Sequence, residues 1–361
     1  MANNITIRQL NNGTYDSLLP RTTASKSYLT NDTSTLYNLQ NGTAEQAIQA
    51  IMRVIALSGN VSMRITDASG NPVVGAIVNG LVGSPISDEN GNVQGIYEYT
   101  PVNIVSPYVD LQDKSVDVKN YVGSINVLTV QLDTYAENTV RRYTNSTSVR
   151  FSKMVKTVDV CCVGGGGGGG NLIITSSGGE TYEHVSGGGG GGAIVNSYGK
   201  SINADTDYTL SVGSGGASGY TGGTGGTTTF LSVSATGGGG AYVYRPDSSS
   251  SPIGKGGSAG SPGSGKGGDY GHNGENSTIS EFDDGVTFYS GGGGSGDRKG
   301  GTPNGANGAY ITGGYPGTST PHSASTPGIG GGGGGATYGN QIQANLPSAG
   351  GPGLVAIRFH F

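Results

Sequence analysis

The distribution of glycine constrains the fold of this chain more than any other feature of its sequence. The chain has 361 residues and 72 glycines, and 62 of the glycines lie after residue 160. Glycine loses more backbone entropy on folding than any other residue. A segment this rich in glycine therefore either stays unfolded, as a linker does, or adopts an unusual ordered structure.

The arrangement of the glycines predicts order. They form separated clusters with polar, turn-like stretches between them, and two apolar stretches, Val158–Val163 and Leu354–Phe359, bracket the segment and are expected to pair as strands. No strict G-X-Y register is present, which excludes collagen. The remaining solution is a set of extended helices with three residues per turn, packed closely and hydrogen-bonded to one another. The clusters are Gly164–Gly170, Gly187–Gly192, Gly237–Gly240, Gly291–Gly294 and Gly330–Gly335.

The first 59 residues contain one predicted helix, over 43–57. Thr43 can cap it, with Gln46 completing a capping box, and Gly59 ends it. One apolar stripe follows at helical spacing, and it has little else in this segment to pack against. The stripe predicts an interface between copies of the chain, in a homotrimer. Its residues are Ile48, Ile51, Met52 and Ile55.

Residues 60–135 are predicted to form a small β-sandwich. Alternating or apolar stretches separated by turns predict strands near 61–66, 73–78, 93–99, 108–111 and 125–132. The run DASGNPVVGAIV followed by SDENGNVQG resembles the carboxypeptidase-regulatory-like family, which implies a transthyretin- or immunoglobulin-like fold. Such modules are mostly spacers or binding platforms.

Residues 136–361 are predicted to form a glycine-rich distal domain, and from near Tyr143 to Phe361 the chain resembles the glycine-rich domain of bacteriophage tail proteins. The resemblance rests on an ordered series of motifs: VDVCCVGGGGGGG, DYTLSVGSGGASG, TTTFLSVSATGGGG, GIGGGGGG and GPGLVAIRF. It implies a β-framed, polyglycine-II-like distal domain. GTYDSLLPRTTASKSYL is also similar to the start of tail-fibre proteins from phages of Gram-positive bacteria. The predicted fold is thus mainly β, multidomain, trimeric and elongated.

Composition argues against several other functions. The net charge of −5 comes from thinly spread charges, so neither nucleic acid nor an anionic membrane is an expected partner. No apolar stretch is long enough to span a bilayer, and no secretory signal is visible, which predicts assembly in a host cytoplasm. Cys161 and Cys162 are neighbours in a predicted strand, where their side chains point to opposite faces, so they are interpreted as buried apolar residues and not as a metal site.

No catalytic constellation is apparent, so neither enzyme activity nor a cofactor is expected. The run Gly260–Lys266 imitates a phosphate-binding loop, but Gly267 stands where Ser or Thr should ligate magnesium. The acidic residues Glu281, Asp283 and Asp284 could form a carboxylate or cation site, although a solvated turn is the commoner outcome.

Tyrosine provides the candidate recognition residues. Tyr offers a flat apolar face and a hydroxyl at low entropic cost, which suits recognition of sugars or proteins on a rigid platform, while some of these residues could instead cap the glycine layers. The recognition surface is expected within 240–325, because binding concentrates in loops. The candidates are Tyr220, Tyr242, Tyr244, Tyr270, Tyr289, Tyr310 and Tyr315.

Together these features predict a virion protein: a tail fibre or tail-tip protein of a phage or phage-tail-like particle that binds a receptor on the host surface. Residues 1–59 would attach to other tail or baseplate proteins, 60–135 would act as a spacer, and the glycine-rich domain would meet a host glycan or protein. Two alternatives remain. One is a purely structural tail or baseplate component that docks other virion proteins, and the other is a bacterial surface adhesin.

Overall fold

Alternation of apolar and polar residues in the sequence accounts for the strand β3 (Asn60–Thr66). The structure is a computed structural model. It describes strands 8–11 and 14–17, residues 59–99 and 101–170, strands 172–175 and 182–185, residues 187–244, 253–269, 273–294 and 328–336, strands 338–339 and 342–343, and residues 347–361. The predicted helix 43–57 and its apolar stripe lie outside these residues. About 35% of the chain is strand and 3% helical, so the predicted mainly β fold is confirmed. No helix within these ranges has the length and apolarity needed to cross a bilayer.

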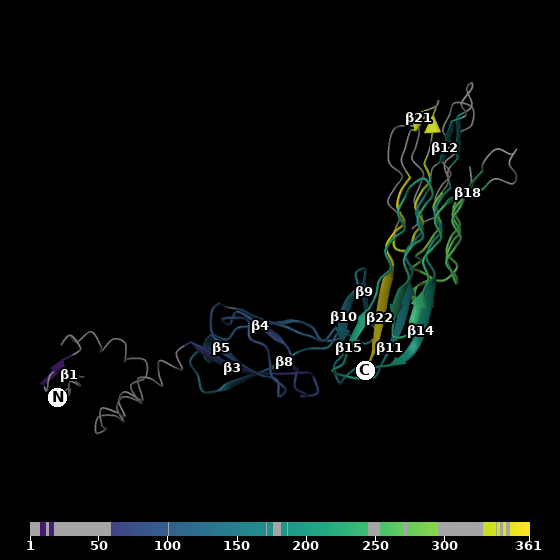
Figure 1. The fold of residues 1–361 in the computed structure, drawn as a ribbon. Helices are drawn as coiled ribbons and strands as arrows, with labels where there is room; N and C mark the ends of the chain where they lie inside the picture. The colour runs from purple at the N-terminus through teal and green to yellow at the C-terminus, as the bar shows by residue number, and fades with distance from the viewer. Residues whose placement is uncertain are drawn as a thin grey trace. The chain divides into compact units, whose positions relative to one another are not determined.

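The described residues fall into two units (Figure 1). The first comprises residues 1–107 and 112–133, and the second comprises residues 108–111 and 134–361. In the first unit, two three-stranded sheets have the strand orders β5-β3-β8 and β4-β6-β7. Their strands are β3 (Asn60–Thr66), β4 (Ile77–Asn79), β5 (Asn92–Ile96), β6 (Val102–Val105), β7 (Lys114–Val116) and β8 (Val127–Gln131). A separate hairpin pairs β1 (Arg8–Asn11) with β2 (Thr14–Ser17), and the short helix η1 spans Lys119–Tyr121.

Strand β3 shows why the first unit folds as the alternation predicts. Val61, Met63 and Ile65 are buried, while Arg64 between them is exposed. The chain then turns because the Asp67 carboxylate accepts the N–H groups of Ser69 and Asn71, each at 2.9 Å. Of the predicted strand 73–78, only the last two residues are in a strand, at the start of β4.

The predicted strand 108–111 is wrong. These residues form a turn that belongs to the second unit. The Asp110 side chain explains the placement, because its carboxylate is fully buried and accepts both the N–H of Ser152, at 2.9 Å, and the Ser152 hydroxyl. A buried carboxylate requires such donors, and the strand pattern of the sequence does not reveal them.

A four-stranded antiparallel sheet with the order β14-β11-β22-β9 begins the second unit. Every residue of β11 pairs with β22, from Thr157 opposite His360 to Val163 opposite Leu354, which confirms the predicted pairing of the two apolar stretches. Cys161 and Cys162 are free, buried and on opposite faces, as predicted. The strands are β9 (Val140–Tyr143), β11 (Thr157–Val163), β14 (Ile194–Ser201) and β22 (Leu354–His360).

One face of this sheet covers the main core of the second unit. Phe359 of β22 packs edge-on against Phe151, with ring centroids 6.2 Å apart, and Phe230 is buried in the same cluster. Two strand pairs border this core. They are β10 (Thr147–Arg150) with β15 (Asp207–Leu210), and β16 (Thr228–Phe230) with β17 (Val233–Ala235).

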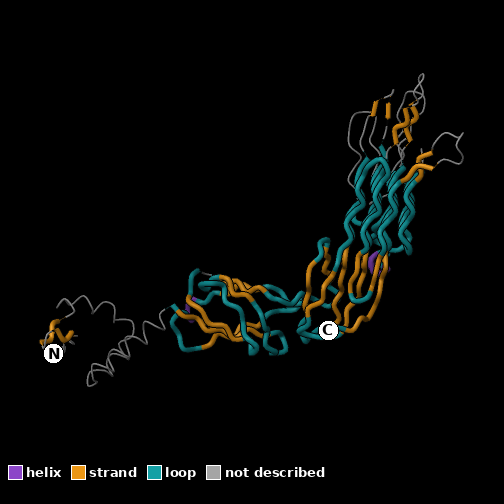
Figure 2. Tube along the Cα trace, in the orientation of Figure 1, coloured by secondary structure: helices purple, strands orange, loops and turns teal. Residues whose placement is uncertain are grey.

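Extended glycine-rich segments continue from the sheet and form what we call the bundle. Figure 2 shows them side by side, drawn as loops, beyond the strands of the sheet. Most of their N–H groups bond to other segments; the Gly331 N–H, which donates to Gly328 three residues earlier, is an exception. The segments are 164–170, 187–193, 213–219, 222–226, 236–241, 255–260, 264–268, 274–277, 290–294, 330–336 and 347–352.

The run 164–170 reveals the period of the bundle. Its donors change partner with every residue and return to the same partner after three, as expected for a helix with three residues per turn. Residues 164, 167 and 170 donate to segment 187–193, residues 165 and 168 to 222–226, and residues 166 and 169 to 347–352. Its carbonyl groups accept from three further segments, 213–219, 236–241 and 330–336. Six neighbours therefore surround this run.

Close packing in the bundle depends on the missing Cβ. A Cβ on Gly167 would lie 2.0 Å from the carbonyl oxygen of Gly239, and one on Gly189 would lie 2.0 Å from that of Gly167. The run 187–192 is buried in the same way as 164–170. Order in the glycine-rich segment, and its polyglycine-II-like form, follow from backbone hydrogen bonds in place of side-chain burial.

Ser290 occupies a position in the bundle that suits glycine. It is fully buried, its φ is 61°, and its hydroxyl has no hydrogen-bond partner among the residues that the structure describes. We expect Ser290→Gly to raise the free energy of unfolding by about 1 kcal/mol, because relief of the left-handed backbone and of the unpaired hydroxyl outweighs the added chain entropy. Chemical denaturation measures this. Ser264→Gly is the control, since the Ser264 hydroxyl donates to the carbonyl of Gly260. Equal effects of the two substitutions on the free energy of unfolding would contradict the view that the backbone and hydroxyl of Ser290 cost stability.

Candidate functional site

The end of the bundle away from the sheet, here called the far end, is formed by the connections between glycine segments. Run 164–170 leaves β11 at Val163, and segment 187–193 leads back into β14. The Gly164 N–H donates to Ala193 at 2.9 Å and the Gly170 N–H donates to Gly187 at 3.1 Å, so the two segments are antiparallel. The hairpin of β12 (Leu172–Thr175) and β13 (Tyr182–Val185) therefore lies at the far end.

Two other short hairpins lie at the same end, as Figure 1 shows by the labels β12, β18 and β21. The backbone agrees, because Ala241, directly before β18, donates to the carbonyl of Gly168, and Ala336, shortly before β20, donates to that of Gly170. These hairpins pair β18 (Tyr242–Tyr244) with β19 (Ile253–Lys255), and β20 (Tyr338–Gly339) with β21 (Ile342–Gln343). The fold thus gathers connections from distant parts of the sequence at one place.

Two of the predicted tyrosines are exposed at the far end. Tyr220 lies in the short turn between segments 213–219 and 222–226 and is 65% exposed, and Tyr242 begins β18 and is 50% exposed. Their backbones are neighbours. The Gly222 N–H donates to the carbonyl of Ala241 at 2.9 Å, and both turns lie against Gly170.

The other predicted tyrosines are distributed differently. Tyr289 lies at the sheet end of the bundle, where its hydroxyl donates to Glu281 and its ring packs against a cluster that includes Phe282. Burial and the Glu281 carboxylate raise the pKa of Tyr289. Tyr244 belongs to β18, and its side chain is outside the described residues. Tyr270, Tyr310 and Tyr315 also lie outside them.

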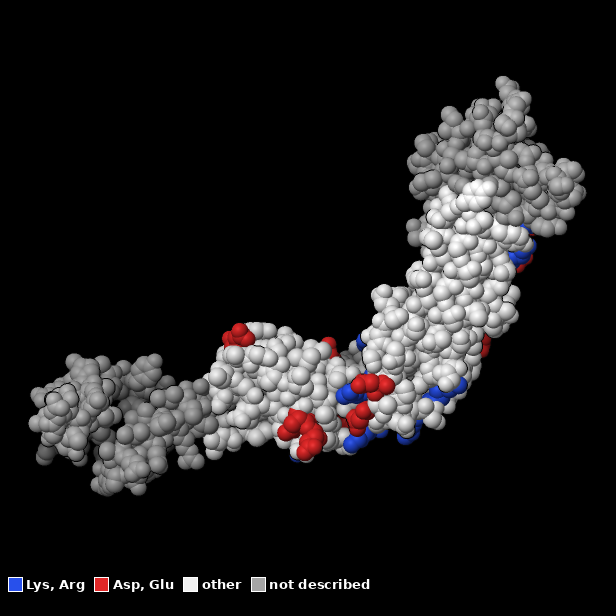
Figure 3. Space-filling view, viewed as in Figure 1, with Lys and Arg blue, Asp and Glu red and all other residues white. Residues whose placement is uncertain are grey.

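Charges near the far end are paired. Lys255, the last residue of β19, lies 3.0 Å from the Asp269 carboxylate, which also accepts the N–H of Gly256 at 2.8 Å. Lys266 lies 3.5 Å from the same carboxylate. Burial raises the pKa of Asp269, but the Gly256 N–H and the two ammonium groups outweigh it and hold the pKa below its usual value. Figure 3 shows few charged atoms over the bundle on the face in view.

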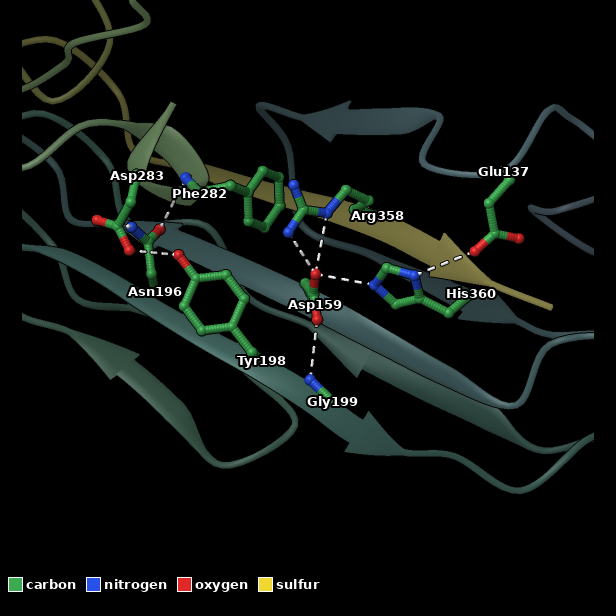
Figure 4. Close-up of polar contacts among 9 residues, drawn as sticks. All are labelled: Glu137, Asp159, Asn196, Tyr198, Gly199, Phe282, Asp283, Arg358 and His360. Carbon is green, nitrogen blue, oxygen red and sulfur yellow. Dashed lines mark hydrogen bonds and ion pairs between the residues drawn. The ribbon is translucent and has the colours of Figure 1, made fainter. Parts of the chain in front are cut away.

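A second polar cluster lies on the outer face of the sheet, at the sheet end (Figure 4). Its centre is Asp159 of β11, whose side chain is 6% exposed. One carboxylate oxygen accepts from Arg358, with Nε at 2.9 Å, and lies 2.8 Å from Nε2 of His360. The other oxygen accepts the N–H of Gly199 at 2.8 Å. His360 also lies 3.3 Å from Glu137.

The cluster around Asp159 holds strands together and offers no free reactive group. Burial raises the pKa of the Asp159 carboxyl, but the Gly199 N–H, His360 and Arg358 outweigh burial and hold that pKa below its usual value. Because Asp159 lies on β11, Arg358 on β22 and Gly199 on β14, the carboxylate joins three strands of the sheet. Sequence analysis did not identify this cluster. The available signal was a single acid in VDVCCV and a single base in LVAIRF, placed opposite each other once the strands pair.

The carboxylates of the acidic residues Glu281, Asp283 and Asp284 all accept hydrogen bonds within the fold. Glu281 is 1% exposed and accepts two hydrogen bonds from Arg142, at 2.7 and 3.1 Å. Asp283 accepts the Tyr198 hydroxyl, and Asp284 accepts the N–H groups of the two residues that follow Gly285. The described residues contain no group of three or more His, Cys, Asp or Glu side chains arranged to hold a metal ion.

The turn that carries these acids, with the short helix η2 (Glu281–Asp283), covers part of the outer face of the sheet. Asn196 of β14 holds it, donating to the Ser280 carbonyl at 2.9 Å and accepting the Phe282 N–H at 3.2 Å. The Arg358 guanidinium lies 4.6 Å from the centre of the Phe282 ring, as Figure 4 shows. The sheet end is thus a firmly bonded base, whereas the far end presents exposed aromatic side chains.

Comparison with known proteins adds one finding. A family model described as a glycine-rich domain matches residues 142–360, which is most of the second unit. No curated protein matches the chain.

Proposed function

The chain belongs to the glycine-rich domain family, and on that premise we propose that it is a tail fibre or tail-tip protein of a phage or phage-tail-like particle that binds a host-surface receptor. It acts in the virion as a homotrimer, with residues 1–59 attached to other tail or baseplate proteins. Its receptor is a wall or surface saccharide, and its role is binding without catalysis.

The observation that supports this proposal is the separation of scaffold and loops in the second unit. Backbone hydrogen bonds fix the bundle, and its connections, with Tyr220 and Tyr242 exposed, gather at the end away from the sheet. Binding residues concentrate on loops that a rigid scaffold positions. Tyr adds a large contact area at low entropic cost, which favours recognition over simple packing.

Trimerisation would supply the affinity. Several weak contacts on one particle raise the overall affinity by a large factor when geometry allows them to act together. A stiff bundle helps, because it limits the freedom lost when the second and third copies bind.

Binding to whole cells tests the proposal. We expect the fluorescently labelled full chain to bind saturably to a narrow set of bacterial strains, and we expect the binding to disappear when wall polysaccharide is stripped. Flow cytometry measures it, with the solution mass of the same sample as a control for trimer formation. A folded trimer that binds no strain would contradict a receptor-binding role and favour a structural tail component that docks other virion proteins.

A further inference from the structure

The two exposed tyrosines at the far end differ from the other described tyrosines of the second unit. We infer that Tyr220 and Tyr242 form one platform that binds a ring of an uncharged saccharide. The inference rests on the proposed function and names the ligand class for it. Tyr220 and Tyr242 come from different connections, so only the folded bundle brings them together.

Backbone contacts establish that the two residues are neighbours. Gly219, directly before Tyr220, donates to Gly169, and Ala241, directly before Tyr242, donates to Gly168. Run 164–170 thus holds both turns at adjacent positions. A Cβ on Gly170 would lie 3.2 Å from the Cβ of Ala241 and 3.5 Å from the carbonyl oxygen of Tyr220.

Exposure and bonding leave both side chains available. Tyr220 is 65% exposed and Tyr242 is 50% exposed, and no hydrogen bond joins either hydroxyl to another residue that the structure describes. Tyr108, Tyr198, Tyr208 and Tyr289, by contrast, each use their hydroxyl in a hydrogen bond within the second unit. An amphipathic ring with a free hydroxyl suits a pyranose, whose C–H face stacks on the ring while its hydroxyl groups bond at the edge.

The charged groups nearby favour an uncharged ligand. Lys255 and Lys266 share the Asp269 carboxylate, at 3.0 and 3.5 Å, so each ammonium group already has an anionic partner that a phosphate-bearing polymer would have to displace. Anion recognition relies on arginine or lysine free to form charge-assisted bonds. Next to Tyr220 in the chain, the exposed residue Thr221 offers a hydroxyl group, which matches the hydroxyl groups of a sugar.

The surroundings also favour a sugar over a protein partner. A stable protein interface needs a broad, well-packed apolar centre of several side chains. Along the chain Tyr220 is flanked by Gly219, Thr221 and Gly222, so its ring stands next to glycine and a small polar residue. One or two sugar rings fit such a surface. The bundle supplies the rest of the affinity by fixing the two backbones before binding.

The test compares tyrosine variants of the full chain on defined polysaccharides. The probes are immobilised uncharged polymers of glucose, galactose, mannose and rhamnose, together with poly(glycerol phosphate). We expect the wild type to bind one or more uncharged polymers. The affinity should change little between about 50 and 500 mM salt, because an uncharged polymer carries no charge for salt to screen. We expect Tyr220→Ala and Tyr242→Ala each to weaken this binding about tenfold or more. Tyr99→Ala is the matched control, because Tyr99 is similarly exposed, at 48%, in the first unit.

Conservative variants separate the ring from the hydroxyl. Tyr220→Phe and Tyr242→Phe keep the ring, so we expect them to retain more of the binding than the alanine variants. Equal affinity of wild type and both alanine variants would overturn the platform, and so would preferential, salt-sensitive binding to poly(glycerol phosphate). Binding to cells that protease treatment abolishes, and polysaccharide stripping does not, would identify a protein receptor and also overturn it.

Cell binding distinguishes failure of the inference from failure of the proposed function. If Tyr220→Ala and Tyr242→Ala bind cells as the wild type does, the platform is wrong while receptor binding stands. If the folded wild type binds no cells, the proposed function itself fails.

Discussion

Replacing Gly167 with alanine is expected to destabilise the second unit by more than about 3 kcal/mol, which is among the largest effects a single methyl group can have. The methyl group would lie 2.0 Å from the Gly239 carbonyl oxygen and 2.4 Å from its carbon. Neither segment can move aside freely, because the Gly167 N–H donates to Gly190 and its carbonyl accepts from Gly333, each at 2.8 Å. At a position where the native backbone accepts a side chain, replacing glycine with alanine stabilises a protein by about 0.4–1 kcal/mol. At Gly167 we expect the opposite, a loss of stability, because the methyl group has no room.

Thermal unfolding and limited proteolysis of the full chain measure the effect of Gly167→Ala. Gly219→Ala is the control, because the nearest atom to its added Cβ, the carbonyl oxygen of Thr221, is 3.4 Å away. We expect this control to change the free energy of unfolding by less than about 0.5 kcal/mol. Similar stability of the two variants would show that run 164–170 is not enclosed by six neighbours.

Replacing Asp159 with asparagine is expected to be the second large effect, at about 2–3 kcal/mol of stability at neutral pH. The neutral amide cannot serve Arg358, His360 and the Gly199 N–H as the carboxylate does, and three strands lose their common partner. Asp207→Asn is the matched control. Asp207 forms a similar cross-strand pair with Arg150, but its side chain is 60% exposed, so we expect little change.

The ion pair between Asp159 and Arg358 also predicts that the stability of the fold depends on pH. The pKa of Asp159 is lower in the folded chain than in the unfolded chain, so its stabilisation is present above the unfolded value and disappears as the pH falls through the folded one. The difference in unfolding free energy between wild type and Asp159→Asn should therefore shrink as the pH falls below about pH 4. Chemical denaturation at a series of pH values measures it. A difference that stays constant down to pH 2 would contradict this account.

Sequence reasoning predicted the frame of the second unit because its signals are local. The stretches Val158–Val163 and Leu354–Phe359 are apolar, β-branched and bracket the glycine clusters, and they pair in full. The glycine clusters could be interpreted as ordered because polar turns separate them. Their arrangement could not be predicted, since one run of glycines is chemically like another and only hydrogen bonding decides which six segments surround 164–170.

The end of the bundle at which each tyrosine lies could not be predicted from the sequence either. Each segment of the bundle leads from one end to the other, so the end at which a residue lies depends on the direction of every preceding segment. Tyr220 and Tyr242 follow segments that lead to the far end, whereas Tyr289 follows 274–277 and lies at the sheet end. The turn 108–111 was missed because its sequence, YVDL, imitates a strand, and the partner of Asp110 is Ser152, far along the chain.

The threefold alternation of partners along run 164–170 gives the bundle something like a reading frame. Adding one residue to the run would rotate every later N–H by roughly a third of a turn, and each would then face the wrong segment. Adding three residues would restore the frame and lengthen the run by one turn, about 9 Å. Insertions and deletions within the glycine runs should therefore persist in multiples of three. The connections outside the runs are free of that rule, so a lineage of such proteins can change these connections residue by residue while its scaffold changes only in whole turns.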